Sequence, residues 1–228
     1  MYFVYLILLT IAAYLSGSVN YAIVITKLVR SQDIRQLGNR NPGTANVGRS
    51  IGKRWGALVF FLDFFKGFIP LLLARLFVFQ ANSYSDFFAL FAMGIAAVGG
   101  HCKPVYYRFK GGGGVATSAG VFLFFIPVEF FVSMLLGAFI ATIFIKNVQF
   151  KLTQWTPILF VTMTPFLTLG LNFLVDLPLF AHISIGGRPW YMIAGIFAIS
   201  FFILFMNLSF MGRRLEECRQ SIKQKEEQ

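Results

Sequence analysis

The chain has 228 residues, of which 57% are hydrophobic and only 13% are charged, and its mean hydropathy is +0.71. A soluble domain is typically about 25% charged, so this composition excludes an ordinary soluble globular protein. The net charge of +11 does not indicate a nucleic-acid partner, because excess lysine and arginine in a membrane protein usually marks cytoplasmic loops.

The first apolar run predicts a membrane-spanning helix over residues 2–26. No lysine or arginine precedes it, so we interpret it as a retained helix rather than a signal peptide. The segment that follows, up to Arg54, is strongly basic, which predicts an outside N-terminus and a cytoplasmic loop. Further spans are expected over 56–79 and 87–99, joined outside by the cation-free turn 80–86.

Residues 115–145 are apolar except for Glu129, and Lys146 and Lys151 follow them. Cations at both ends predict a hairpin of two short helices that turns near Pro127–Glu129. The alternative is one long tilted helix, which would invert the orientation of everything that follows.

The last spans are expected over 155–175 and 190–210, with an outer loop between them. The expected fold is an all-α polytopic membrane protein with about seven transmembrane helices, its N-terminus outside and its C-terminus cytoplasmic. Residues 1–212 would form one membrane domain, and residues 213–228 a charged cytoplasmic tail. A transporter or channel is the generic alternative, but the sequence shows no internal repeat that would favour one.

The stretch GGHCKPVYYRFKGGGGVATSAG, residues 99–120, lies between two apolar segments. Its four consecutive glycines carry no Cβ, so their backbone N–H groups can converge on an anion. The N-terminus of the helix that follows adds partial positive charge. The natural ligand of such a nest is a phosphate at the membrane surface. The alternative, which this loop taken alone favours, is a solvated basic loop.

The loop GNRNPGTANVGRSIGKR, residues 38–54, is rich in turn residues and is not expected to form one helix. Arg49 and Lys53 are four residues apart and would share a face if this part is helical. They would form a second wall of the phosphate site, where the planar guanidinium of Arg49 can bind phosphate bidentately.

Asp63 and Lys66 are three residues apart within an apolar span, so an internal ion pair is expected. His101 adjoins Cys102, but no further Cys/His cluster accompanies them, so we expect neither a metal site nor a cofactor.

The chain resembles the bacterial acyl-phosphate:glycerol-3-phosphate acyltransferases, the PlsY family, over most of its length. The matching motifs are Gly17-Ser18, N-P-G-x-x-N-V-x-R (Asn41–Arg49), L-D-x-x-K-G-x-x-P (Leu62–Pro70) and G-H-x-x-P…F-K-G-G-x-G-V-A-T (Gly100–Thr117). The resemblance implies a seven-helix bundle in the bacterial inner (plasma) membrane. It also implies transfer of a fatty acyl group from acyl phosphate to the 1-hydroxyl of glycerol 3-phosphate, giving lysophosphatidic acid for phospholipid synthesis.

By this resemblance His101 and Asn46 are catalytic, Arg49 grips glycerol 3-phosphate, and the glycine stretch cradles the acyl phosphate. The other expected substrate-binding residues are Asn41, Gly43, Lys53, Lys110, Gly111, Gly112, Gly113, Gly114, Thr117 and Ser118. The apolar helices would give the acyl chain a path from the bilayer.

The chain departs from the family pattern at single positions and in one whole motif. Gly113 stands where the family's G-G-K-G loop has lysine, and Asn39 stands where the family has serine. The family's C-terminal H-R-x-N-I motif is absent from Gly212–Ile222. The alternative function is therefore a catalytically degenerate membrane protein that binds a phosphorylated lipid precursor or a partner.

Overall fold

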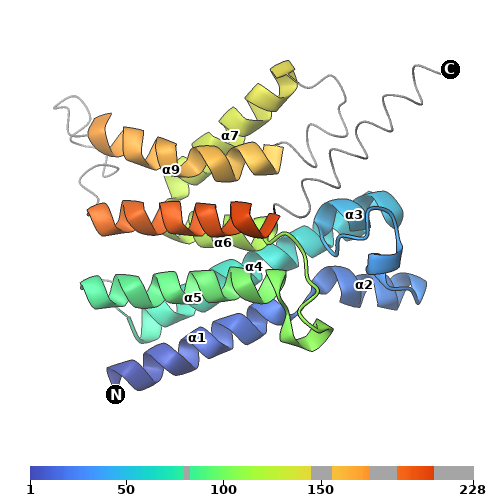
Figure 1. The fold of residues 1–228 in the computed structure, drawn as a ribbon, viewed down its shortest axis with the longest axis horizontal. Coiled ribbons are helices and arrows are strands. Elements are labelled where there is room, and N and C mark those ends of the chain that lie inside the picture. Colours follow the sequence, from blue (N-terminus) through green and yellow to red (C-terminus); the bar gives the residue numbers. More distant parts are fainter. Residues whose placement is uncertain (80–82, 145–155, 175–188, 208–228) are drawn as a thin grey trace.

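The computed structural model describes residues 1–79, 83–144, 156–174 and 189–207. Every regular element within these ranges is a helix, which confirms the expected all-α fold (Figure 1). Six helical segments in this part are long and apolar enough to cross a bilayer. The tail 213–228 and the two lysines after residue 145 lie outside the described residues.

The first span is not the single helix that we predicted over 2–26. It consists of α1 (Tyr2–Ser18) and α2 (Tyr21–Arg30), separated at Val19 and Asn20. The Asn20 side chain caps α2 by accepting from the Ile23 N–H at 3.1 Å, and its Nδ2 donates to the carbonyl of Pro42 at 3.2 Å. The interruption is therefore stabilised by contacts with the loop that follows α2.

After the 3₁₀ turn η1 (Ile34–Gln36) and the short helix α3 (Thr44–Ser50), the next two spans are α4 (Lys53–Phe77) and α5 (Tyr84–Cys102). Both begin a few residues before their predicted starts. The Ser83 hydroxyl accepts from the Asp86 N–H at 3.2 Å and so caps the start of α5. Pro104 disfavours helical backbone at the residue before it, and α5 accordingly stops at Cys102.

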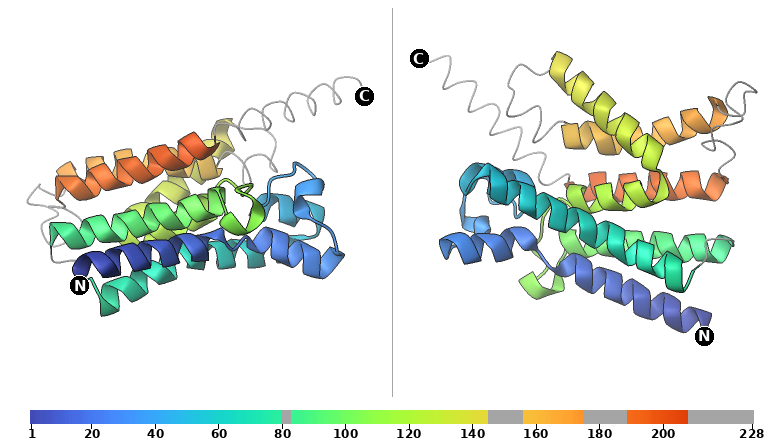
Figure 2. Two further views of the ribbon diagram at one scale, coloured as in Figure 1. Left: turned by 60° about the horizontal axis from the view of Figure 1, so that its bottom comes forward. Right: turned by 180° about the vertical axis from the view of Figure 1, so that it is seen from behind.

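The apolar run after the glycine stretch forms two helices, α6 (Val115–Phe125) and α7 (Pro127–Phe144). Pro127 has no N–H and restricts the conformation of Ile126, so the helix is interrupted at Ile126, between α6 and α7. In Figures 1 and 2, α6 starts at the end of the bundle that holds the glycine stretch, and α7 returns to that end. The hairpin expectation is confirmed, and Glu129 is fully buried in the first turn of α7, directly after the break.

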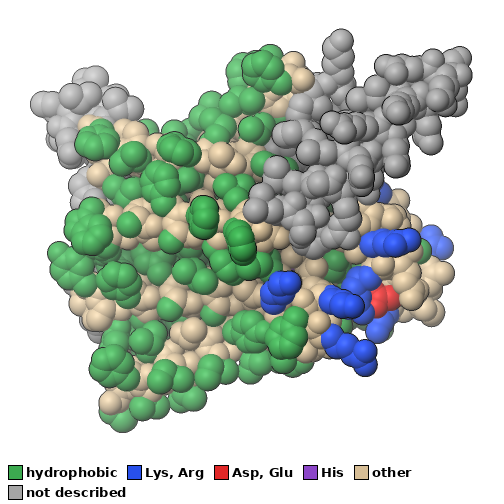
Figure 3. Space-filling view, viewed as in Figure 1, with side chains coloured by type: hydrophobic (Ala, Val, Ile, Leu, Met, Phe, Trp, Pro, Cys, Tyr) green, Lys and Arg blue, Asp and Glu red, His purple; other side chains and the backbone are tan. Residues whose placement is uncertain are grey.

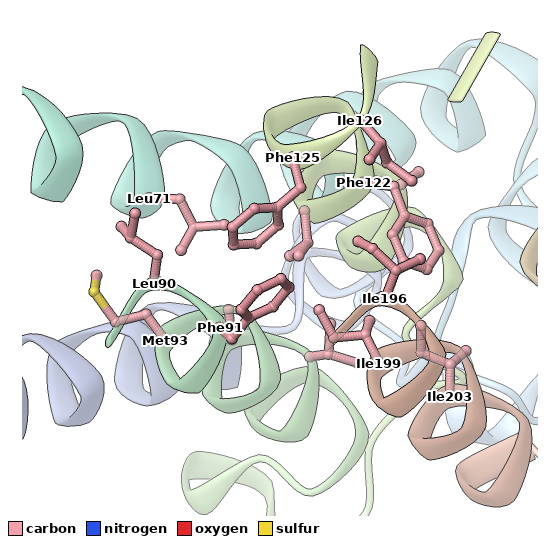
Figure 4. Close-up of a cluster of buried hydrophobic side chains, with 14 of the residues drawn as sticks. Leu71, Leu90, Phe91, Met93, Phe122, Phe125, Ile126, Ile196, Ile199 and Ile203 are labelled. Atoms are coloured by element: carbon pink, nitrogen blue, oxygen red, sulfur yellow. The ribbon is translucent and has the colours of Figure 1, made fainter. Parts of the chain in front are cut away.

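The bundle is completed by α9 (Thr156–Leu174) and the last described helix, Trp190–Asn207, which agree with the spans expected over 155–175 and 190–210. Three isoleucines of that last helix, Ile196, Ile199 and Ile203, enter the core (Figure 4). They meet aromatic side chains of α5 and α6, among which Phe91 and Phe125 stack with ring centroids 4.2 Å apart.

Close helix packing places α6 against α4. A Cβ at Gly67 of α4 would collide with the Thr117 carbonyl of α6, and a Cβ at Gly120 would collide with the Phe64 carbonyl of α4. Small residues of this kind let membrane helices approach each other at backbone distance. The N-terminus of α6 is therefore held at a fixed place beside α4.

Hydrophobic side chains cover the length of the bundle, while lysines and arginines gather at one end (Figure 3). That end holds the loops that follow α2 and α5, and the N-terminus lies at the opposite end (Figure 1). This separation agrees with the expected clustering of basic loops on one side of the membrane.

Candidate active site

The glycine stretch folds back onto the C-terminal end of α5. After the turn η2 (Val105–Tyr107), Arg108 and Phe109 adopt left-handed backbone angles, with φ of 55° and 58°. The Gly112 N–H then donates to the His101 carbonyl at 3.1 Å. A Cβ at Gly112 would collide with Nε2 of His101, so only glycine permits this approach.

The stretch leads into an uncapped helix N-terminus. Gly114 is the N-cap of α6, with φ of 76°, and no side chain caps this helix. The N–H groups in the first turn of a helix have no intrahelical partners and attract anions. Of the glycine N–H groups that we expected to converge on an anion, that of Gly112 is instead used on the His101 carbonyl.

A cationic cavity of about 380 Å³ lies on one side of the glycine stretch. Its lining includes four cations, Arg35, Arg40, Lys103 and Lys110, together with Gly111 and Gly112. Asp33 pairs with Arg35, with Oδ2 lying 2.7 Å from Nη2 of the guanidinium. This hydrogen bond lowers the pKa of the Asp33 carboxyl, and the ionised carboxylate orients Arg35.

A second cavity, of about 230 Å³, lies where the stretch enters α6. It combines polar groups with apolar side chains from four helices, α3, α4, α6 and α9. Its lining consists of Asn41, Gly43, Thr44, Ala45, Phe60, Asp63, His101, Gly113, Gly114, Val115, Ala116 and Pro157.

A buried ion pair supports the floor of the second cavity. Nζ of Lys66 lies 2.7 Å from Oδ1 of Asp63, which confirms the expected pair, and it also donates to the Val19 carbonyl at 2.6 Å. Nδ1 of His101 lies 3.6 Å from the same carboxylate oxygen. One ring nitrogen of His101 thus faces a carboxylate, at a distance longer than a hydrogen bond, and the other faces Gly112.

Asn46 organises the first loop and lines neither cavity. It is buried, and its Nδ2 donates to the carbonyls of Leu37 at 2.9 Å and Ile34 at 3.3 Å. Its Oδ1 accepts from the Asn39 N–H at 3.2 Å. The side chain we expected in catalysis therefore ties together the loop that carries Asn41 and Gly43 to the second cavity.

Arg49 and Lys53 do not share a helix face. Arg49 lies in the last turn of α3 and Lys53 is the first residue of α4, with Gly52 between the helices at φ of 128°. Neither belongs to the lining of the two cavities. The cations brought to the glycine stretch include Arg35 and Arg40, which sequence reasoning missed because neither belongs to a motif.

Thr117 and Ser118 also lie outside the two cavities. Thr117 is buried against the Gly67 backbone, and the Ser118 hydroxyl donates to the Val115 carbonyl at 2.8 Å. Of the predicted residues, the structure gathers His101, Asn41, Gly43, Gly113 and Gly114 at the second cavity, and Lys110, Gly111 and Gly112 at the cationic cavity.

Asn207 lies on the last described helix and contacts the glycine stretch, although it belongs to none of the motifs found in the sequence. It is 3% exposed, and its Nδ2 donates to the Gly113 carbonyl at 2.6 Å. A polar residue at the end of an apolar span was the only signal in the sequence.

Residues 7–215 match the family model described as glycerol-3-phosphate acyltransferase. The glycerol-3-phosphate acyltransferase of Aquifex aeolicus is 49% identical over 114 residues, which is 50% of this chain and 56% of that protein. The one from Mycoplasma capricolum is 36% identical over 149 residues, covering 65% of this chain and 57% of that protein. The alignments thus span little more than half the length of these curated relatives.

A crystal structure of PlsY (YgiH), described as an integral membrane glycerol 3-phosphate acyltransferase in its glycerol 3-phosphate form, has a similar fold. Its TM-score is 0.67 at 31% identity, and the alignment covers 93% of this chain and 92% of that one.

Proposed function

Because this chain belongs to the glycerol-3-phosphate acyltransferase family, we propose that it transfers a fatty acyl group from acyl phosphate to the 1-hydroxyl of glycerol 3-phosphate. The product would be lysophosphatidic acid, made for phospholipid synthesis. Since its relatives are bacterial, we place the protein in a bacterial inner membrane, with the cationic end cytoplasmic. The observation that carries the proposal is the glycine stretch, which separates a cationic cavity from a cavity containing a histidine–carboxylate pair.

Glycerol 3-phosphate fits the cationic cavity. Its phosphate is a dianion at neutral pH, and four cations line the space. Arginine and lysine side chains supply both directional and point-charge contacts to a phosphate. The lining of this cavity contains no residue of α3, so the expected contact of Arg49 with the phosphate stays a prediction.

Acyl phosphate fits the second cavity. Its phosphate would lie at the uncapped N-terminus of α6, where backbone N–H groups favour an anion. The half-buried side chains of Phe60 on α4 and Pro157 on α9 offer an apolar route for the acyl chain toward the bilayer. The acyl carbonyl would then lie near His101, at the boundary between the two cavities.

The transfer needs little covalent chemistry from the protein, because the acyl group is already activated. The glycerol 1-hydroxyl oxygen forms a bond to the acyl carbon, and the bond from that carbon to the phosphate oxygen breaks. His101 takes the hydroxyl proton, Asp63 orients the ring, and the released phosphate carries the proton away. Fixed N–H groups and cations supply most of the rate enhancement by alignment and charge stabilisation.

The assay is turnover of palmitoyl phosphate with labelled glycerol 3-phosphate by purified protein in mild detergent. We expect lysophosphatidic acid to form, and His101→Ala to lower kcat by at least about 100-fold. Arg30→Ala, which removes an exposed cation outside both cavities, should leave turnover unchanged. No product from the native protein would reject the proposal.

A binding role without turnover is the second candidate, favoured by one observation. Gly113 replaces the lysine of the related loops, and the Asn207 side chain is packed against it. In this case glycerol 3-phosphate would bind, but no acyl transfer would follow. Binding measured by calorimetry, together with absent turnover in the same preparation, would select this candidate.

A further inference from the structure

The amide of Asn207 joins the last described helix to the glycine stretch. Both hydrogens of Nδ2 are used, one on the Gly113 carbonyl at 2.6 Å and one on the Ile203 carbonyl at 2.8 Å. Two carbonyl partners require the NH₂ group at this position, so the orientation of the amide is determined by its neighbours. The contact joins residues that are 94 positions apart in the sequence.

The other end of the same amide is packed against the stretch. Oδ1 of Asn207 is buried without a hydrogen-bond partner in the described part of the chain, and a Cβ at Gly113 would collide with it. A buried oxygen without a partner lowers stability, so this side chain is retained at a cost. Any side chain at position 113 would displace Asn207, which links the two positions.

The tether determines the direction of one peptide group. Because a trans peptide is planar, its carbonyl and N–H point in opposite directions. The Gly113 carbonyl points to Asn207, so the Gly114 N–H points away from the last helix, and no carbonyl in the described residues accepts from it. Gly113 and Gly114 both line the second cavity.

We propose that Asn207 is a positioning residue for acyl transfer: it holds the peptide between Gly113 and Gly114 so that the start of α6 stays ready to receive phosphate. The uncharged amide of Asn207, from the last described helix, occupies the place where the Cβ of a larger residue 113 would lie. This inference rests on the proposed acyl transfer for its kinetic consequence. Its structural consequence, a loop held in one conformation, can be measured separately.

The test compares the native protein with Asn207→Asp and Asn207→Leu. Both substitutions keep a similar volume and remove the donor, one with a negative charge and one without. Ser200→Ala is the matched control, since Ser200 is buried on the same helix and its hydroxyl has no partner among the described residues. The readouts are kcat and KM for palmitoyl phosphate, and hydrogen exchange of the backbone amides from Gly111 to Thr117.

We expect both Asn207 variants to lose about 10- to 100-fold in kcat/KM and to exchange faster at the stretch, because a small misplacement of a binding group has effects of this size. Ser200→Ala should match the native protein in both measurements. A loss of kcat/KM in Asn207→Asp alone would show that the added charge is the cause, and it would overturn the proposal. Unchanged hydrogen exchange from Gly111 to Thr117 in both variants would overturn it as well.

The two proposals fail separately. If the native protein turns over nothing, acyl transfer is rejected, and exchange at the stretch still tests the tether. If the native protein is active and both Asn207 variants keep kcat/KM within about twofold, the tether is rejected and the acyl-transfer proposal stands.

Discussion

Replacing Asp63, alone and together with Lys66, should distinguish the contribution of its carboxylate to stability from its contribution to turnover. Asp63 and Lys66 are 1% and 2% exposed, and their charged atoms lie 2.7 Å apart. In Asp63→Ala the ammonium of Lys66 loses its carboxylate and keeps two neutral partners among the described residues, the Val19 carbonyl and the ring of Tyr21, whose centroid is 5.6 Å away. An unpaired buried charge of this kind costs about 3–5 kcal/mol. A cost of 1 kcal/mol shifts Tm by roughly 2–4 °C in a chain of this size, so Tm should fall by about 6–20 °C.

The double variant Asp63→Leu/Lys66→Met removes both charges. Replacing a complete buried ion pair by apolar residues of similar volume is often neutral or stabilising. We therefore expect its Tm in detergent to return to within a few degrees of the native value. Its turnover should stay low, because His101 has lost the carboxylate 3.6 Å from Nδ1.

Thermal unfolding and palmitoyl phosphate turnover, measured on the same preparations, check both parts. A Tm for Asp63→Ala within about 2 °C of native would refute the assigned energy of the pair. Native turnover in the double variant would refute an orienting role for Asp63, even if the stability pattern were as expected.

Three further predictions concern the loops. Lys110→Ala should raise KM for glycerol 3-phosphate about tenfold, and this difference should shrink at high salt, as steady-state rates at two ionic strengths will show. Gly112→Ala should lower kcat/KM by about 100-fold, because its Cβ would collide with His101. The control is Gly170→Ala, whose Cβ meets no described atom within 4 Å. It should keep native turnover and gain roughly 0.5–1 kcal/mol of stability. The hydrogen bond to Arg35 lowers the pKa of Asp33 in the folded protein. The stabilisation from this pair is therefore present above the unfolded pKa of about 3.9 and is lost as the pH falls through the lower folded pKa. The Tm difference between the native protein and Asp33→Asn should be constant from pH 5 to 7 and disappear in stronger acid.

Much of the architecture was predictable from local patterns. Apolar runs of bilayer length indicate spanning helices, because backbone groups in lipid must be satisfied within the segment. Proline after Ile126 indicated the break between α6 and α7, and the three-residue spacing of Asp63 and Lys66 indicated their pairing. The four glycines before an apolar run likewise predicted an open helix N-terminus, which the structure has at Gly114.

The composition of the site depended on contacts between distant segments. Asn46 belongs to a motif, yet it bonds to the carbonyls of its own loop, and Arg35 reaches the cationic cavity without any motif. At the interruption between α1 and α2, the Val19 carbonyl accepts from Nζ of Lys66, which lies 47 positions later in the sequence. Local periodicity states which face of a helix is apolar, but it does not state which helices become neighbours.

The sequence by itself determined that this is a polytopic helical membrane protein with basic loops on one side and a glycine-rich stretch before a helix, because hydropathy, charge and missing side chains act locally. Only the tertiary structure decided that Asp63 faces His101 and that Asn207 meets Gly113. The Asn207 contact arises because residue 113 has no Cβ, and the Asp63 contact arises because α4 packs beside α5; both depend on the shapes of two surfaces at once.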